Sequence, residues 1–103
     1  MKNIYQDFPK SLKNEIFEEI EKTELIRIER IISNGHKSSD SFWYDQDENE
    51  WIILLQGKAE LLFKKNNVKK ILLPGNYIKI MQHELHKVVF TSSKTIWLAI
   101  FYK

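Results

Sequence analysis

The chain lacks cysteine and has little glycine and proline, with three glycines and two prolines in 103 residues. The absence of thiols excludes disulfide scaffolds, thiolate metal sites and cysteine nucleophiles. No apolar run approaches the roughly 20 residues that a membrane-spanning helix needs. The polar N-terminus also lacks the apolar core of a signal peptide. We therefore expect a cytoplasmic protein that has no membrane partner.

A strong charge of one sign is also missing. Sixteen lysines and arginines against 14 acidic residues give a net charge of +2. The lysine pairs 64–65 and 69–70 flank an expected hairpin turn at 66–67, where they are typical of a solvated strand edge. This near-neutral balance gives no reason to expect a nucleic-acid partner. The length and the 43% share of hydrophobic residues indicate a single globular unit.

The hydrophobic periodicity divides the chain near residue 24. Leu12, Ile16, Phe17 and Ile20 lie at helical spacing, which predicts residues 1–24 to be an N-terminal helical arm packing on the rest. From residue 25 the period is two, and residues 25–103 are predicted to form a β-barrel domain. The expected strands are 25–32, 51–55, 58–64, 68–73, 76–81, 87–91 and 95–102. The prediction is an all-β fold with one short N-terminal α-helix.

Polar side chains precede two of the apolar strands. Glu50 comes directly before the strand 51–55, and strand alternation places it on the same face as Ile52 and Leu54. Gln46 precedes Glu50 with the same parity, and His86 opens the strand at 87–91. Carboxylate, imidazole and amide groups that meet at the mouth of a closed sheet can hold a divalent metal ion with open positions for a ligand.

Two spaced motifs resemble those of the cupin superfamily. Glu50 and Gly57, with six residues between them, match the end of the first cupin motif, and Gly75 and His86 match the spacing of the second. The two histidines usual before the glutamate are replaced, by Tyr44 and Gln46 or by Trp43 and Asp45 depending on the gap. Met81 and His83 stand where the second motif usually has proline and glycine.

The chain looks most similar to small single-domain bacterial cupins. The segments that carry this resemblance are ERIISNGHKS, WYDQ, EWIILLQGKAEL, PGNY and TIWLAIFY. The resemblance implies a double-stranded β-helix, that is, a jelly-roll barrel with its site inside one end. It also implies a divalent metal ion, a small-molecule ligand and a homodimer.

The candidate metal ligands are not equivalent. Glu50 and His86 are the strongest, whereas the amide oxygen of Gln46 is a poor ligand for zinc or iron. Asp45 is a better ligand chemically but has the opposite strand parity, so only a bulge or loop would turn it inward. The metal itself is left open among zinc, iron, manganese and nickel. Further pocket residues are expected at Tyr44, Trp43, Met81 and His83.

Two classes of function follow from this set. The first is a metal-dependent enzyme of isomerase, lyase or dioxygenase type that acts on a small metabolite. The second is a cupin without a metal, which either binds a metabolite without catalysis or is structural. The fold alone does not choose between them.

Overall fold

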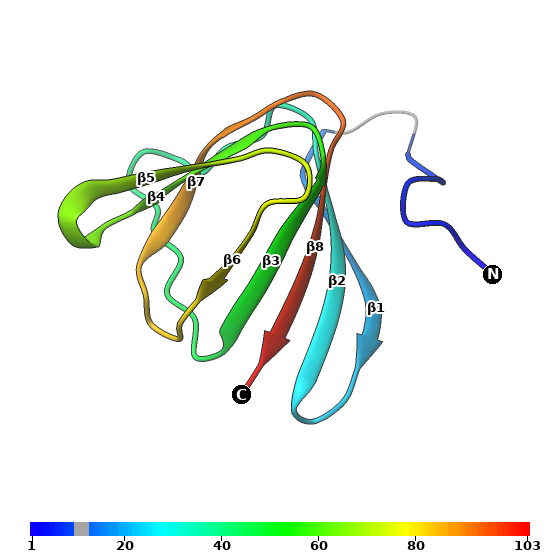
Figure 1. The fold of residues 1–103 in the computed structure, drawn as a ribbon, viewed down its shortest axis with the longest axis horizontal. Helices are drawn as coiled ribbons and strands as arrows, with labels where there is room; N and C mark the ends of the chain where they lie inside the picture. Colours follow the sequence, from blue (N-terminus) through cyan, green and yellow to red (C-terminus); the bar gives the residue numbers. More distant parts are fainter. Residues whose placement is uncertain (10–12) are drawn as a thin grey trace.

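The computed structural model describes residues 1–9 and 13–103, and β-strands dominate them (Figure 1). The strands are β1 (Ile16–Lys22), β2 (Ile26–Ser33), β3 (Asn49–Gln56), β4 (Ala59–Phe63), β5 (Val68–Leu72), β6 (Tyr77–Ile80), β7 (His86–Thr91) and β8 (Thr95–Tyr102). A short 3-10 turn, η1 (Lys65–Asn67), joins β4 to β5. Each strand expected after residue 24 is found within two residues of its expected bounds, so the all-β prediction is confirmed.

The strands form two antiparallel sheets that face each other as the walls of a barrel (Figure 1). One sheet has five strands in the order β1-β2-β8-β3-β6, and the other has three in the order β5-β4-β7. Side chains alternate along each strand, so every second residue points into the space between the sheets. The core is built from these inward residues, which include Ile52, Leu54, Leu61, Trp97 and Ala99.

The predicted N-terminal helix is wrong, since residues 16–22 form β1 and pair with β2. The register shifts between Glu19 and Glu21, so Ile20 is the extra residue of a bulge. Ile16 and Phe17 are adjacent apolar residues before this bulge, and together with Ile20 they occur at a spacing that imitates a helix. Pairing with β2 satisfies the backbone of β1, and tertiary pairing of this kind overrides a weak helical pattern. Leu12, which belonged to the predicted helix, lies outside the described residues.

The first residues of the chain run along the outer side of β2, where one arginine holds them. Arg30 of β2 is only 6% exposed. Its guanidinium donates hydrogen bonds to the backbone carbonyls of Ile4, Gln6 and Asp7 and to the carboxylate of Glu18. A buried cation requires such partners, so Arg30 acts as a structural anchor for this segment.

The structure explains why the first cupin-like motif has a glycine at position 57. Gly57 connects β3 to β4 with φ +89°, and a Cβ atom there would lie 2.6 Å from Thr95 Oγ1 and 2.7 Å from Ser92 Oγ. Only glycine combines this backbone conformation with so close an approach. The β3–β4 turn is therefore packed against the turn that joins β7 to β8. Within the described residues, no helix has the length and hydropathy to cross a bilayer.

Candidate functional site

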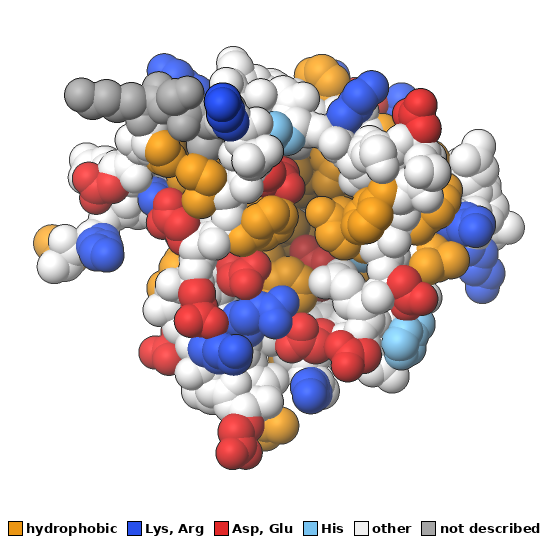
Figure 2. Space-filling view, turned by 180° about the vertical axis from the view of Figure 1, so that it is seen from behind, with side chains coloured by type: hydrophobic (Ala, Val, Ile, Leu, Met, Phe, Trp, Pro, Cys, Tyr) orange, Lys and Arg blue, Asp and Glu red, His pale blue; other side chains and the backbone are white. Residues whose placement is uncertain are grey.

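A cavity of about 260 Å³ lies between the two sheets and is the strongest candidate for a functional site. The molecule is hollowed on the face opposite to that of Figure 1, with hydrophobic side chains and acidic groups around and inside the hollow (Figure 2). Aromatic and aliphatic side chains make up most of the cavity wall, which is lined by Glu15, Phe17, Arg27, Glu29, Ile31, Tyr44, Gln46, Glu50, Ile52, Leu61, Ile80, His86, Val88, Trp97 and Phe101. An apolar cavity with a few converging polar groups is typical of a small-molecule site.

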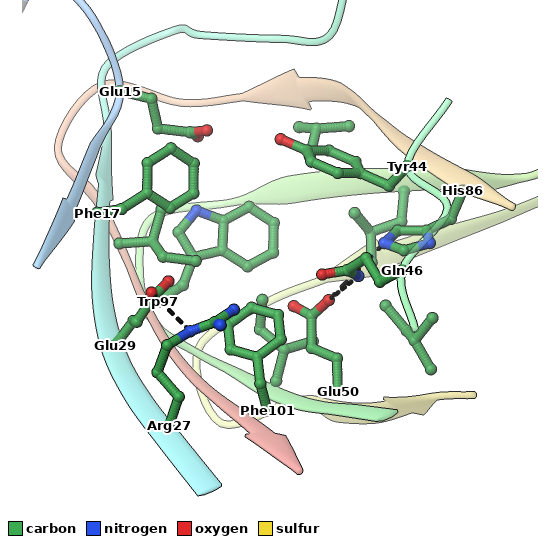
Figure 3. Close-up of a pocket in the computed structure, with 15 residues that line it drawn as sticks. Glu15, Phe17, Arg27, Glu29, Tyr44, Gln46, Glu50, His86, Trp97 and Phe101 are labelled. Carbon is green, nitrogen blue, oxygen red and sulfur yellow. Dashed lines mark hydrogen bonds and ion pairs between the residues drawn. The ribbon is translucent and has the colours of Figure 1, made fainter. Parts of the chain in front are cut away.

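Three of the predicted residues converge on one wall of this cavity (Figure 3). Glu50 enters from β3 and His86 from the start of β7, and His86 Nε2 lies 3.8 Å from Glu50 Oε1. Gln46 comes from the loop before β3, and its side-chain amide donates a hydrogen bond of 3.0 Å to Glu50 Oε1. The side chains of Glu50 and His86 are 8% and 5% exposed. The structure thus brings the acid and the imidazole together in one cavity.

Backbone pairing explains how a loop residue reaches this wall. Tyr44 forms an isolated β-bridge with His86, with backbone hydrogen bonds of 2.7 and 3.3 Å. The amide of His83 donates to the carbonyl of Gln46 at 2.6 Å. These bonds tie the segment before β3 to the segment before β7, so the two halves of the site are held by the backbone.

The protonation of His86 follows from its backbone partner. His86 Nδ1 lies 2.8 Å from the carbonyl oxygen of Glu84, and a carbonyl only accepts, so Nδ1 carries a hydrogen. In the neutral ring Nε2 is then an acceptor, and it faces the Glu50 carboxylate, which also accepts. One proton on either group turns this contact between two acceptors into a favourable one.

Burial changes the pKa values of two groups on this wall, Glu50 and Tyr44. Burial raises the pKa of Glu50 above its usual value, while the hydrogen bond from Gln46 and the nearby His86 act in the opposite direction. Burial also raises the pKa of the Tyr44 hydroxyl, and the negative charges of Glu15 and Glu50 add to this effect. Tyr44 therefore keeps its proton and can donate a hydrogen bond into the cavity.

A second group of charged residues surrounds the only arginine found among the described lining residues. Arg27 of β2 forms ion pairs with Glu29 at 2.9 Å and with Glu48 at 3.1 Å. Its guanidinium carbon lies 4.2 Å from the centre of the Phe101 ring, within the range of a cation–π interaction. Two carboxylates and an aromatic ring thus already engage the positive charge of Arg27.

A third polar group lies at the end of the cavity beside Phe17. Ser33 Oγ donates to the carboxylate of Glu15 and accepts a 3.2 Å hydrogen bond from Trp97 Nε1. Figure 3 shows the Glu15 carboxylate beside the Phe17 ring, pointing into the same space as the Tyr44 hydroxyl. Phe17 is 52% exposed, which places this end of the cavity next to solvent.

Four predicted residues do not line the cavity. Asp45 and His83 face outward and pair with each other at 2.8 Å, with side chains 56% and 63% exposed. Met81 is 51% exposed, and Trp43 packs under the ammonium groups of Lys87 and Lys64. Asp45 keeps the outward orientation that its strand parity indicates, because no bulge turns it inward.

Sequence reasoning missed the polar residues contributed by β1 and β2. Glu15 and Phe17 fell within the supposed helix, and Arg27 and Glu29 lay in an expected strand without being considered as site residues. A signal for the latter two was present: they share the parity of Ile31, an inward residue of the core. Charged side chains that alternate on the apolar side of a strand indicate a polar cavity rather than a filled core.

The donor set is a poor match for a tightly held zinc or iron ion. Catalytic zinc sites use three protein ligands, and non-haem iron sites use two histidines and a carboxylate. This wall of the cavity offers Glu50 and His86 as strong ligands, with the weak amide oxygen of Gln46 beside them, while Glu29 is paired with Arg27 and Glu15 with Ser33. No cluster of three histidine or acidic side chains that could hold a metal ion is found in residues 1–9 and 13–103. The residues therefore do not fit a resident metal of this kind.

Comparison with known proteins identifies the family. No protein-family model matches the chain, and no curated protein matches it either. A solved structure from Ralstonia eutropha JMP134, provisionally named a mannose-6-phosphate isomerase, is 31% identical and superposes with a TM-score of 0.95. This match covers 100% of the present chain and 97% of the other.

More distant solved structures share the fold. A cupin superfamily protein from Desulfitobacterium hafniense DCB-2 is 16% identical with a TM-score of 0.77, over 92% of this chain and 83% of the other. HppE, in its cobalt(II) form with Tris buffer, is 14% identical with a TM-score of 0.73, over 85% of this chain and 53% of the other. The barrel, its motifs and these similarities define the class of protein. The chain belongs to the cupin superfamily and has its double-stranded β-helix fold.

Proposed function

We propose that this cupin binds a small metabolite in its barrel cavity and exchanges a proton with it through Glu50 and His86. The observation that carries the proposal is the 3.8 Å approach of two buried acceptor atoms, Glu50 Oε1 and His86 Nε2, in a mostly apolar cavity. Burial raises the pKa of Glu50, so its carboxyl group can hold a proton and pass it to a substrate bound beside the imidazole.

Proton transfer at carbon is the chemistry of many isomerases and lyases, and it needs only an acid–base pair in contact with the substrate. The name of the Ralstonia eutropha protein, an isomerase, agrees with this type of reaction. Dioxygen chemistry requires a metal or cofactor, for which the Glu50–His86 pair is an incomplete ligand set. We therefore place isomerase- or lyase-type proton transfer ahead of the dioxygenase alternative.

A thermal-shift screen tests the binding part of the proposal, because a ligand that binds the folded state raises its melting temperature. The screen uses hydroxy and keto metabolites, amines and divalent metal salts with the intact chain. We expect stabilisation by at least one organic compound, and loss of that stabilisation in Val88→Phe, which fills the cavity. Stabilisation that survives in Val88→Phe, or none by any organic compound, contradicts the proposal.

Elemental analysis of the purified protein tests the metal-free form of the proposal. We expect far less than one equivalent of zinc, iron, manganese or nickel per chain. A stoichiometric metal that is lost in both Glu50→Gln and His86→Ala would contradict it and would favour the metal-dependent enzyme.

The homodimer remains a prediction, and the outer face of the five-stranded sheet is its proposed interface. Trp51, Ile53, Leu98 and Ile100 alternate with the core residues of β3 and β8, and all four are only partly buried. A contiguous apolar sheet face of this kind is typical of an interface. Sedimentation velocity on the intact chain would show a dimer if the prediction holds and a monomer if it fails.

A further inference from the structure

The charges around the cavity differ from those expected for the phosphosugar named for the Ralstonia eutropha protein. A glutamate and an imidazole that share one proton contribute no net charge, so Glu50 and His86 cancel. The remaining charged lining residues are Glu15, Glu29 and Arg27, which sum to a charge of −1. Glu48, the second partner of Arg27, adds a further negative charge at the edge of this group.

Of the basic side chains that commonly bind phosphate, Arg27 is the only one in the described lining. Lysines and arginines, helix N-termini and runs of free backbone amides are the common phosphate ligands. No lysine lines the cavity in the described residues, and Arg27 is engaged by Glu29, Glu48 and Phe101. An anionic ligand at Arg27 would therefore have to compete with two carboxylates for its guanidinium.

The end of the cavity beside Phe17 favours a cation over an anion. Phe17, Tyr44 and Trp97 line this end together with the carboxylate of Glu15 (Figure 3). Faces of aromatic rings attract cations, and several rings around one space are a known way to bind alkylammonium groups. Only one Glu15 oxygen has a hydrogen-bond partner in the described residues, namely Ser33 Oγ. Within residues 1–9 and 13–103, the other oxygen accepts no hydrogen bond and can face a positive group in the cavity.

We propose that the ligand of this cavity is a small organic cation, with an alkylammonium group bound among Phe17, Tyr44, Trp97 and Glu15. The rest of the molecule then extends toward Glu50 and His86. This inference rests on the proposed function, because it assigns a ligand class to the same cavity. It departs from the name of the Ralstonia eutropha protein, whose substrate would be an anion.

Isothermal titration calorimetry with matched probes tests the inference. Choline is the cationic probe, neohexyl alcohol is its uncharged carbon isostere, and inorganic phosphate and mannose 6-phosphate are the anionic probes. We expect choline to bind about tenfold tighter than neohexyl alcohol, a difference of about 1.4 kcal/mol, and the anions to give no saturable heat. Val88→Phe should abolish the binding of choline, which places the site in the cavity.

Two variants that each remove one negative charge distinguish the local effect of Glu15 from the effect of the protein's net charge. Glu15→Gln keeps an oxygen that can accept from Ser33, and we expect it to weaken choline binding about tenfold while leaving neohexyl alcohol binding unchanged. Glu24→Gln removes the same charge from the exposed turn between β1 and β2 and should have no effect. The melting temperature of each variant shows whether it has folded.

The outcomes distinguish this inference from the proposed function. If neohexyl alcohol or an anion binds in the cavity as tightly as choline, the cation assignment is overturned and the binding role of the cavity remains. If Glu15→Gln and Glu24→Gln weaken choline equally, the assignment to Glu15 is overturned. If no probe gives saturable heat, the inference falls, and the thermal-shift screen decides the proposed function separately.

Discussion

The protein contains two carboxylate–imidazole pairs that differ in their surroundings. Asp45 and His83 lie at the surface 2.8 Å apart, whereas Glu50 and His86 lie 3.8 Å apart inside the cavity. The shorter contact is the less consequential one, because exposed ion pairs contribute little to stability and are screened by salt. The longer contact lies where an unpaired charge is costly. The comparison shows that burial, more than distance, decides which pair can do chemistry.

The largest expected difference between the two pairs is in zinc binding, after a third strong ligand is added beside the buried pair. Gln46→His adds an imidazole at a position whose side chain already contacts Glu50. We expect the bound zinc to rise from well below one to about one ion per chain, because three protein ligands suffice for a catalytic-type zinc site. Asp45→His adds the same group outside the cavity and should bind no additional zinc. Elemental analysis after dialysis against zinc measures both, and equal uptake would show that the cavity is not the site.

Removing one imidazole from each pair should have unequal effects on stability. His86→Ala removes a ring that stacks on Tyr44 and Phe63 and leaves Glu50 without its partner. We expect it to lower the free energy of unfolding by about 3 kcal/mol. His83→Asn retains a residue type that tolerates the positive φ of position 83 and should cost less than about 1 kcal/mol. Urea denaturation measures both values, and similar losses would contradict the contrast.

The free energy of unfolding should depend on pH through the titration of Glu50. Its pKa is raised in the folded state, so its stabilising contribution is complete below the unfolded-state value of 4.5. That contribution is lost as the pH rises through the folded-state pKa. Glu50→Gln should flatten this part of the profile and be more stable than the parent protein above it. Asp45→Asn, which removes a carboxylate outside the cavity, is the matched control. Melting temperatures measured between pH 4 and pH 9 test this prediction. The same pH profile for both variants would contradict it.

The smallest expected effect is the coupling within the exposed pair. A double-mutant cycle with Asp45→Asn and His83→Asn should give a coupling energy of about 0.5 kcal/mol at low ionic strength. About 1 M salt should remove most of this energy through screening. The cycle is measured by urea denaturation at pH 5.5, where the imidazole of an exposed histidine is largely charged. A coupling that salt does not reduce would show that the pair is less exposed than the structure indicates.

Much of the fold could be predicted because local patterns and the final structure agree. The alternation of residues 95–102 identified β8, and the Asn66–Asn67 turn lies between β4 and β5 with positive φ at both residues. Prediction failed at β1, where the adjacent apolar residues Ile16 and Phe17 and a bulge at Ile20 hide the alternation of a strand. A shift of one residue places side chains on the opposite face of a strand, so a sequence pattern cannot reveal such a bulge without its partner strand.

The candidate site was predictable only in part. Glu50, Gln46, Tyr44 and His86 were found from parity and spacing, because strand alternation is a local property. Asp45, Trp43, Met81 and His83 were further candidates, Asp45 with the opposite strand parity, and they lie outside the cavity. Glu15, directly before β1, and Arg27 of β2 were missed because β1 and β2 are the strands most distant along the sheet from β6, and only the pairing of β1, β2 and β8 brings these residues to the same cavity.

The sequence by itself determined that the chain is a β-barrel of cupin type and that an acid and an imidazole share its interior. The strands follow from side-chain alternation, which is local, and the barrel and its interior site from the resemblance of the two motifs to those of cupins. The tertiary structure alone decided that the cavity has too few ligands for a tight zinc or iron site, and that its other end is aromatic and acidic. Such properties arise from residues far apart in the chain, because the closing of two sheets sets which inward side chains face one another.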